Sequence, residues 1–408
     1  MRARNKLIVL GILSAAVVVF LTMQLSPGVC TDPQLAQGLI VDHLTGEVYH
    51  VYYGQLHSHT KDSDGGRPVD LPGGTPYDAY LYARDTAGLD FFSVADHCSY
   101  PYDPDDPHNP YGNDGLTVEE YENLKAVANG FNAPGPGGFV TFWGFEWTSD
   151  DTSWGGPDTL LGKGHLTIIN SPDHCEADEP PTNDLQGLVA WMSDPRRNNC
   201  FAFFNHPGQY GYDFDNFLGY FSDKIVGMEL WNRSDDYYDQ GSATGPNNNG
   251  IWYDNALGKG WYIGAAGSGD NHYRDWGTLN EWRMAVLAKE KTRESIYDAI
   301  MARRFYSTRD KNLVLTFTCN GAQMGSKIKI KGGRLDVMIE ASDGDGEIFS
   351  KIYLLKNGKR IQTWKPNSTN PHVTTTVNGS PGDYFYVLVE QSGELKWRAI
   401  SSPIFIVE

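Results

Sequence analysis

Nine histidine and carboxylate side chains lie close to short apolar segments of this sequence. They are His57, His59, Asp64, His97, Glu146, His165, His206, Asp270 and His272. In an extended segment, residues two apart point to the same side, so the first two imidazoles can reach one metal ion. One such pair is more often incidental than functional, but nine groups together indicate a metal site. Imidazole and carboxylate donors without thiolate suit zinc, manganese or iron.

These side chains need strands to bring them together. Apolar strands are predicted at 89–95, 139–145, 165–170, 200–204, 225–230 and 261–266. Helices are predicted between several of them, at 76–86, 117–129, 184–192, 252–257 and 292–303, the second of them from a capping-box pattern of Thr117 and Glu120. Most candidate ligands directly follow a predicted strand, whereas His165 begins one. The alternation predicts an α/β fold of parallel βαβ units, with the ligands at the carboxyl ends of its strands.

The sequence changes character after about residue 311. Short alternating segments separated by Asn-Gly and Pro-Gly turns predict a C-terminal β-sandwich at 311–408. The predicted organisation is therefore a leader at 1–30, a metal-binding domain at 31–310 and the β-sandwich.

Charge excludes one class of partner. The chain has 408 residues and a net charge of −18, and residues 31–310 hold 18 basic against 42 acidic side chains. A domain with this excess of acidic side chains repels the phosphate backbone of nucleic acids. Nucleic acid is therefore not an expected partner. No obligate protein partner is evident.

The first residues predict export. Arg2, Arg4 and Lys6 precede an apolar run at 7–23, as in a signal peptide. No clear cleavage site follows, so an uncleaved membrane anchor stays open. The expected location is periplasmic, secreted or anchored on the outer face of the membrane. Export permits disulfides among Cys98, Cys175, Cys200 and Cys319; pairing Cys175 with Cys200 closes the shortest loop, and four free thiols are the alternative.

Six ordered motifs resemble those of the polymerase-and-histidinol-phosphatase (PHP) superfamily. They are 54–65, 88–97, 144–147, 164–165, 205–207 and 267–272, and they span roughly residues 50–310. Two departures are Gly269, inserted where the family often has Gly-Ser-Asp, and Ala95, where it often has Thr. The exported carbaryl-hydrolase-like (CehA/McbA-like) branch also carries a β-sandwich after its catalytic domain, as the end at 402–407 suggests here.

The resemblance implies a distorted (β/α)7 barrel that holds two or three divalent ions, usually zinc, manganese or iron. His57, His59, Glu146 and Asp270 would hold the first, and Glu146 would bridge to a second held by His165 and His206. Asp64, His97 and His272 would hold a third.

The implied activity is that of an exported phosphoesterase, a hydrolase of phosphomono- or diesters that uses a metal-bridging hydroxide. Alternatives are a carbamate or carboxylic ester hydrolase on the same site, and a non-catalytic metal- or glycan-binding module. Asp96 is expected to orient a ligand imidazole. Lys61 and Arg274 are expected either to bind a substrate phosphate or to be solvated surface charges.

Overall fold

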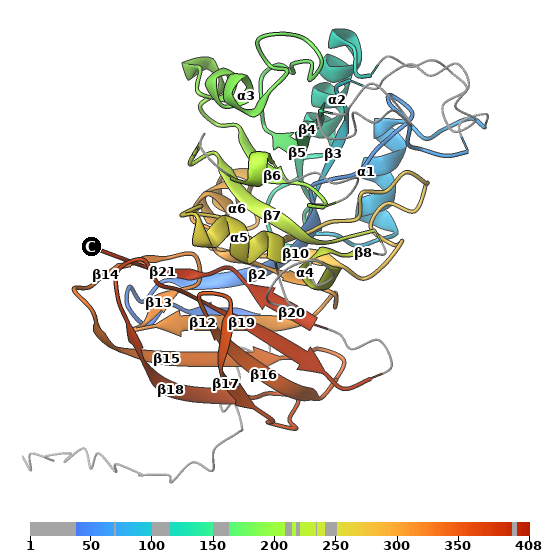
Figure 1. The fold of residues 1–408 in the computed structure, drawn as a ribbon. Coiled ribbons are helices and arrows are strands. Elements are labelled where there is room, and N and C mark those ends of the chain that lie inside the picture. Colours follow the sequence, from blue (N-terminus) through green and yellow to red (C-terminus); the bar gives the residue numbers. More distant parts are fainter. Residues whose placement is uncertain are drawn as a thin grey trace, which may run out of the picture.

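The protein is a mixed α/β structure in which strands outnumber helices. The computed structural model describes residues 38–68, 71–99, 115–149, 163–208, 214–217, 221–233, 235–240, 251–393 and 398–408. Figure 1 shows the helices α1, α2 and α3 beside strands β3 to β6 in one part of the molecule, and a second part built of strands. The predicted leader lies outside the described residues. Among those residues, no helix has the length and apolar character needed to cross a membrane.

The first part is organised around a sheet that is only partly parallel. Its strands are β1 (Leu39–Val41), β2 (Val48–Gln55), β3 (Phe91–His97), β4 (Val140–Ser149), β5 (Gly164–Ile169), β6 (Phe201–Phe204), β7 (Ile225–Asn232), β8 (Asp235–Asp236), β9 (Gly264–Gly267), β10 (Arg283–Ala288) and β11 (Phe305–Thr308). Neighbours β2–β3–β4 and β6–β7–β9 are parallel. β5 runs antiparallel to both β4 and β6, and β10 is antiparallel to β2 and β11. The prediction of parallel units is therefore right for these two sets of three strands and wrong at β5.

The reversed direction of β5 explains the exceptional position of His165. In the β4–β5 register, His165 lies opposite Thr148, near the end of β4. Because β5 enters the sheet where β3 and β4 leave it, its first residues share an edge with their last residues. A ligand at the start of an antiparallel strand thus joins ligands at the ends of parallel ones.

Four of the six described α-helices begin directly after a residue whose side chain caps them. The six helices are α1 (Pro76–Asp85), α2 (Val118–Phe131), α3 (Leu185–Met192), α4 (Tyr237–Gln240), α5 (Ile251–Gly258) and α6 (Arg293–Met301). Thr117 and Glu120 form the expected capping box of α2, and Thr75 and Asp78 form another at α1. The buried faces of α1 and α2 pack on β3 and β4, where Tyr80 donates a hydrogen bond to the carbonyl of Phe142.

The C-terminal part has two packed layers. One is the sheet of β13 (Ala322–Gln323), β12 (Val314–Cys319), β15 (Gly333–Ser342) and β18 (His372–Gly379). The other contains β14 (Lys327–Lys329), β16 (Phe349–Lys356), β17 (Lys359–Trp364), β19 (Tyr384–Gln391), β20 (Arg398–Ser401) and β21 (Ile404–Val407). Phe317 and Ile339 of the first layer share a core with Ile352 and Val387 of the second.

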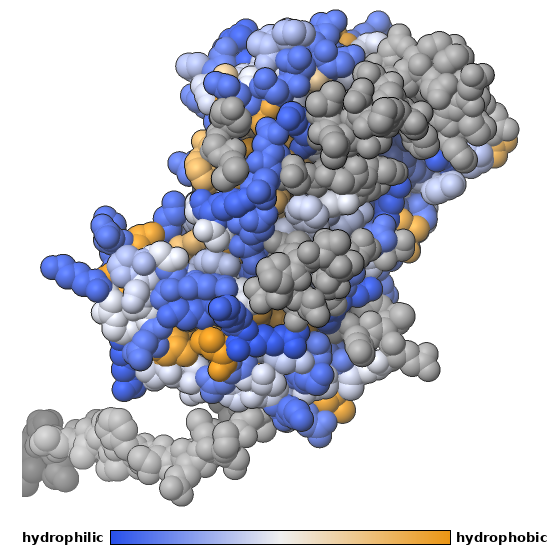
Figure 2. Space-filling model, viewed as in Figure 1, coloured by the Kyte–Doolittle hydropathy of each residue, from blue (hydrophilic) through white to orange (hydrophobic). Residues whose placement is uncertain are grey.

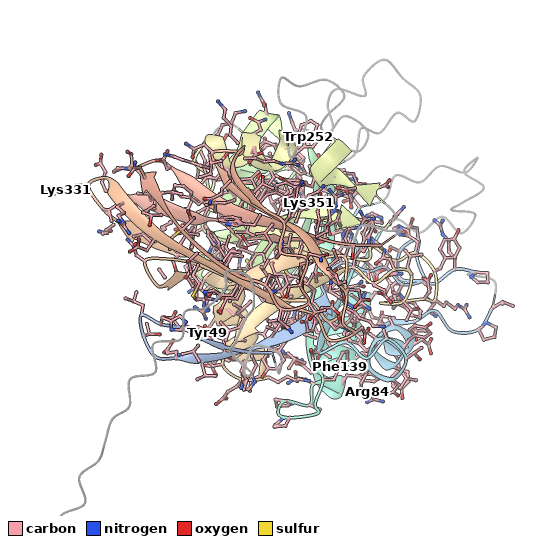
Figure 3. The ribbon with its side chains drawn as sticks, turned by 90° about the horizontal axis from the view of Figure 1, so that it is seen from below. Tyr49, Arg84, Phe139, Trp252, Lys331 and Lys351 are labelled. Carbon is pink, nitrogen blue, oxygen red and sulfur yellow. The ribbon has the colours of Figure 1, made fainter. Side chains whose placement is uncertain are left out.

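The C-terminal layers pack directly on the sheet of the first part. β11 pairs with β20, and the same core includes Tyr49 of β2 and Tyr306 of β11. Figure 3 shows Tyr49 beside the C-terminal strands, whereas Lys331 and Arg84 lie at opposite ends of the molecule. The boundary near residue 311 stays a prediction, because strands and core cross it. On the face shown in Figure 2, polar residues cover most of the described surface and apolar patches are small.

The four cysteines among the described residues are free thiols. Cys98, Cys200 and Cys319 are buried and Cys175 is half-buried, so the structure lacks the Cys175–Cys200 bridge that the short loop favoured. Burial raises the pKa of Cys98 and Cys319 to about 12, so these thiols are inert at neutral pH.

Asp254 joins α5 to β19 and makes stability depend on pH. Its Oδ1 accepts hydrogen bonds from the hydroxyls of Tyr386 (3.1 Å) and Tyr384 (3.3 Å), yet burial raises its pKa to about 7. Unfolding lowers this pKa to about 3.9. Between these values the folded chain binds the extra proton, so stability falls as pH rises from about 4 to 7.

Replacing Asp254 by asparagine should therefore stabilise the protein at alkaline pH. The amide keeps an acceptor for the tyrosines and carries no charge. We expect the free energy of unfolding at pH 8 to increase by about 1–3 kcal/mol, and the gain to shrink toward pH 4. Urea unfolding of both proteins at pH 5 and pH 8 measures the difference. An equal effect at both pH values would contradict this ionisation.

Candidate metal centre

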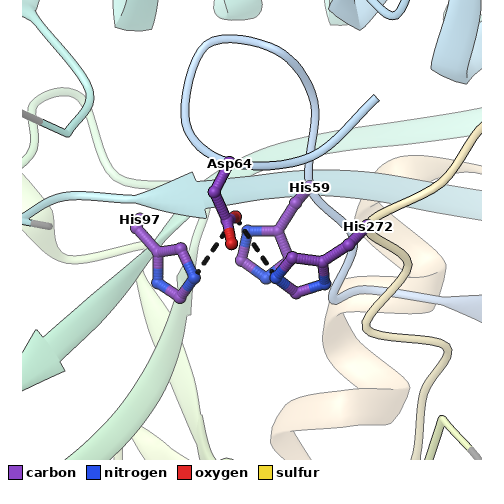
Figure 4. A group of neighbouring side chains, drawn as sticks. All are labelled: His59, Asp64, His97 and His272. Carbon is purple, nitrogen blue, oxygen red and sulfur yellow. Dashed lines mark ion pairs between the residues drawn. The ribbon is translucent and has the colours of Figure 1, made fainter. Parts of the chain in front are cut away.

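All nine sequence-predicted ligands converge in one buried cluster. Each is at most 8% exposed. Three subsets have ligand atoms within 4.8 Å of one another: His59, Asp64, His97 and His272; His57, His59 and Glu146; and His97, Glu146 and His165. Figure 4 shows the first subset, in which the Asp64 carboxylate lies 3.6 Å from His97 Nε2 and 3.2 Å from His272 Nε2.

The first and last motifs hold each other in place. The amide of Asp270 donates to the carbonyl of His57, and the amide of His59 donates to the carbonyl of Asn271, both at 2.9 Å. His206 and Asp270 have φ angles of 23° and 44°, which non-glycine residues rarely adopt. Such backbone strain is characteristic of positions that a functional site fixes.

Glu146 lies at the centre of the cluster. Its Oε1 is 3.2 Å from both His165 Nδ1 and His206 Nε2. Its Oε2 is 2.9 Å from His97 Nδ1 and 3.3 Å from His57 Nε2. Each oxygen of this one carboxylate therefore faces at least two imidazoles, which is the geometry that a ligand bridging two metal ions needs.

Burial and neighbouring charges shift the pKa values of several titratable groups in the cluster. Burial opposes ionisation of Glu146 and Asp270, but nearby imidazoles, together with Arg233 beside Asp270, lower the pKa of both carboxyls well below the usual range. Burial also lowers the pKa of His57, but the carboxylates around it outweigh burial and raise that pKa well above its usual value. In His59, burial and two neighbouring imidazoles lower the pKa. Metal binding at His57 would thus displace a proton, so affinity should fall as the pH falls.

The residues present fit divalent metal ions. Asp64 Oδ1 and Glu146 Oε2 are buried and have no hydrogen-bond partner, and His57 Nε2 faces His59 Nε2 at 3.0 Å. Buried acceptors normally have donors, so carboxylate oxygens that face several imidazole nitrogens and make no hydrogen bond indicate a cation site. All nine donors are imidazole nitrogens or carboxylate oxygens, a set that suits zinc, manganese or iron.

The distances group the ligands differently from the family pattern. His59 lies with Asp64, His97 and His272 as well as with His57, and His97 also joins the group of Glu146 and His165. His206 approaches Glu146, and Asp270 Oδ1 lies 3.0 Å from His59 Nε2. The assignment of ligands to individual ions stays a prediction.

Asp96 has a different role from the one predicted. Its carboxylate accepts hydrogen bonds from the amide (2.6 Å) and hydroxyl (2.7 Å) of Thr60 and from the hydroxyl of Ser63 (2.7 Å). It therefore fixes the turn between His59 and Asp64, and it positions ligands through their backbone rather than through an imidazole N–H.

Lys61 and Arg274, expected either to bind a substrate phosphate or to be solvated surface charges, lie outside the cluster. Arg274 donates four hydrogen bonds to the carbonyls of Gly66, Pro68, Leu71 and Pro72, and so fastens that loop. Its phosphate-binding role has no support in this geometry, because four of its five donors are engaged. Lys61 is exposed in a shallow depression beside α1 and α2.

Three polar residues that the sequence reasoning missed complete the site. Glu229, within β7, lies 2.9 Å from His57 Nδ1 and also accepts from the amide of His206. Asn205 donates to Glu146 Oε1 at 2.6 Å. Arg233 follows β7 and contacts Asp270 Oδ2 at 3.0 Å. Sequence signals could have revealed two of them. Glu229 is a lone carboxylate in an apolar strand, and Arg233 is a cation directly after that strand.

Glu229 takes the role expected of Asp96, because it orients His57 and fixes its tautomer. We expect Glu229→Gln to weaken metal affinity and turnover by about 10–100-fold, since His57 remains but loses its anionic partner. Metal titration and turnover measure the two effects, and the conservative Glu229→Asp should recover part of each. Wild-type metal affinity in Glu229→Gln would contradict this role.

Comparisons with known proteins give distant relatives. No family model matches the chain. Proteins of Chlamydia muridarum and Chlamydia trachomatis, each described as uncharacterized, are 24% identical to it over an alignment of 392 residues, and the match covers 88% of this chain. The chain spans 57% of the length of each. A solved two-domain protein of Bacteroides vulgatus, described as containing a predicted PHP-like metal-dependent phosphoesterase, is 17% identical with a TM-score of 0.44, and the match covers 84% of this chain and 90% of that one.

Proposed function

We propose that this chain is an exported metal-dependent hydrolase of the PHP type, most closely of its carbaryl-hydrolase-like branch, that cleaves phosphate mono- or diesters. The observation that carries the proposal is the convergence of nine imidazole and carboxylate side chains, Glu146 among them, in one buried cluster. A barrel-like first domain and a β-sandwich are supported by strand ends that meet at one site and by two packed C-terminal layers. Export is proposed from the sequence of residues 1–30.

In the proposed hydrolase, different residues of the site have different roles. Divalent ions held by the nine ligands would activate water and neutralise charge on a phosphoryl oxygen. Glu229, Asn205 and Asp96 hold the ligands or their backbone in place. Arg67 and Arg233 lie at the rim, with side chains 22% and 39% exposed, and contact Asp64 and Asp270.

Hydrolysis of a substrate panel tests the proposal. Purified protein supplied with zinc, manganese or iron should cleave phosphomonoesters or phosphodiesters, and Asp270→Ala should lack that activity. Cleavage of carbamates or carboxylic esters alone would establish the alternative hydrolase on the same ligands. Metal binding without hydrolysis of any class would indicate a non-catalytic module.

Arg233 is the cation that we expect to bind the substrate phosphate. Its guanidinium carries planar donors suited to phosphate and reaches the cluster while staying partly exposed. We expect Arg233→Ala to raise KM for phosphoesters about tenfold, the cost of one charge-assisted hydrogen bond, and Arg233→Lys to recover part of it. Steady-state kinetics of both variants and of Lys61→Ala show whether Arg233 or Lys61 binds the substrate phosphate. An unchanged KM in Arg233→Ala, or an equal rise for carboxylic esters, would contradict a phosphate contact.

A further inference from the structure

A second group of carboxylates lies between the C-terminal layers and the segment that enters them. Asp310, Asp343 and Glu347 have ligand oxygens within 4.8 Å of one another, and none of them belongs to the metal centre. Asp310 lies between β11 and β12, and the other two lie in the turn between β15 and β16. Three like charges this close repel one another unless a cation or shared protons compensate them.

The local backbone presents these carboxylates in one arrangement. Asp343 Oδ1 accepts hydrogen bonds from the amides of Asp345 (2.9 Å), Gly346 (2.7 Å) and Glu347 (3.0 Å). Gly346 has a φ of 89°, which glycine adopts without strain. The turn therefore wraps around the Asp343 carboxylate and places the Glu347 side chain in contact with it.

An independent observation points to a missing cation. Gln391 ends β19 and is 1% exposed. Its Nε2 donates to Asp343 Oδ2 at 2.7 Å, and the same amide bonds to the Asp310 carboxylate, so it lies between the two. Its Oε1 is buried and has no hydrogen-bond partner.

Two further oxygens repeat this pattern. Glu347 Oε2 and Asn312 Oδ1 are also buried without a partner. Buried acceptors are rarely left without a donor, so three of them beside a carboxylate cluster indicate a ligand that supplies positive charge.

We propose that Asp310, Asp343 and Glu347, with the amide oxygen of Gln391, bind one calcium ion that ties the segment after β11 to the β15–β16 turn. The donors are all oxygens, which suit calcium and not the imidazole-preferring metals of the first site. Calcium accepts irregular oxygen ligation, whereas magnesium demands an octahedron and retains its waters. This site is structural and does not depend on the proposed hydrolase activity.

Calcium binding to the full chain tests the proposal. The protein is first loaded with manganese so that the metal centre is filled, and calcium is then titrated in equilibrium dialysis and in thermal unfolding. We expect one additional calcium per chain, with a Kd of about 10⁻⁵–10⁻³ M. The Tm should rise with calcium concentration, and magnesium should bind at least about tenfold more weakly.

Substitutions of the proposed ligands test where the calcium ion binds. We expect Asp343→Asn and Glu347→Gln each to weaken calcium binding at least about tenfold, because each removes one anionic ligand. Asp336→Asn is the matched control, since Asp336 lies exposed on β15 and pairs with Arg334 outside the cluster. His59→Ala should bind calcium as the wild type does, which separates this site from the metal centre.

Two results would overturn the proposal. One is the absence of any added calcium at millimolar concentration, which would mean that the carboxylates share protons instead. The other is undiminished binding in Glu347→Gln. If Asp343→Asn proves unfolded by circular dichroism, Glu347→Gln alone decides, because the three amide hydrogen bonds of the turn go to Asp343 and not to Glu347.

Discussion

Replacing His59 by alanine should abolish turnover while the protein stays folded. His59 Nε2 lies 3.0 Å from His57 Nε2 and 3.0 Å from Asp270 Oδ1, and His59 belongs to two of the three ligand groups. Its loss therefore removes a nitrogen ligand from the middle of the site. We expect turnover to fall at least about 10³-fold, equivalent to about 4 kcal/mol in activation free energy, with a loss of bound metal.

Matched variants separate this effect from damage to the fold. His372→Ala removes a histidine from β18 that pairs with Glu340, and it should leave turnover unchanged. Asp270→Ala should match His59→Ala, whereas Asp96→Asn should lower turnover only partly, because the turn after His59 keeps some of its hydrogen bonds. Circular dichroism and elemental analysis accompany the kinetics. Wild-type turnover and metal content in His59→Ala would refute the ligand assignment from His57 onward.

Removing the metal should eliminate activity completely and reversibly. The unpartnered oxygens of Asp64 and Glu146 and the raised pKa of His57 describe a site that divalent cations complete. We expect two to three divalent ions per chain as purified, loss of all activity on exhaustive chelation, and recovery when zinc, manganese or iron is returned. Activity should also rise toward alkaline pH, because ligands must release their protons to bind metal.

Elemental analysis and a chelation series measure this prediction. Less than one equivalent of metal after growth with all three metals supplied would count against the centre. Activity that survives exhaustive chelation would remove metal from the mechanism whatever the substrate. Asp336→Asn, which alters an exposed carboxylate on β15, should show the same chelation curve as the wild type.

The sequence alone determined the chemical identity of the candidate site and most of its supports. Apolar runs ending in histidine or carboxylate predicted β3 and β4 and the ligands His97 and Glu146, and the pair Thr117–Glu120 predicted the start of α2. The inferences about these elements are confirmed because periodicity and capping are properties of neighbouring residues, whereas the ligand roles of His97 and Glu146 stay predictions. The strands β10 and β11 were missed, although both are fully buried and align β2 with the C-terminal layers.

Only the tertiary structure decided which distant groups meet. It reversed β5, so that His165 reaches the ends of β3 and β4. It gave His57 the partner Glu229, which is 172 residues away, and it turned Asp96 toward Thr60 and Ser63. It also engaged Arg274 with loop carbonyls. Spacing along a chain restricts contacts within a turn or strand, whereas partners across the fold are selected by packing and by the need to satisfy every buried polar group.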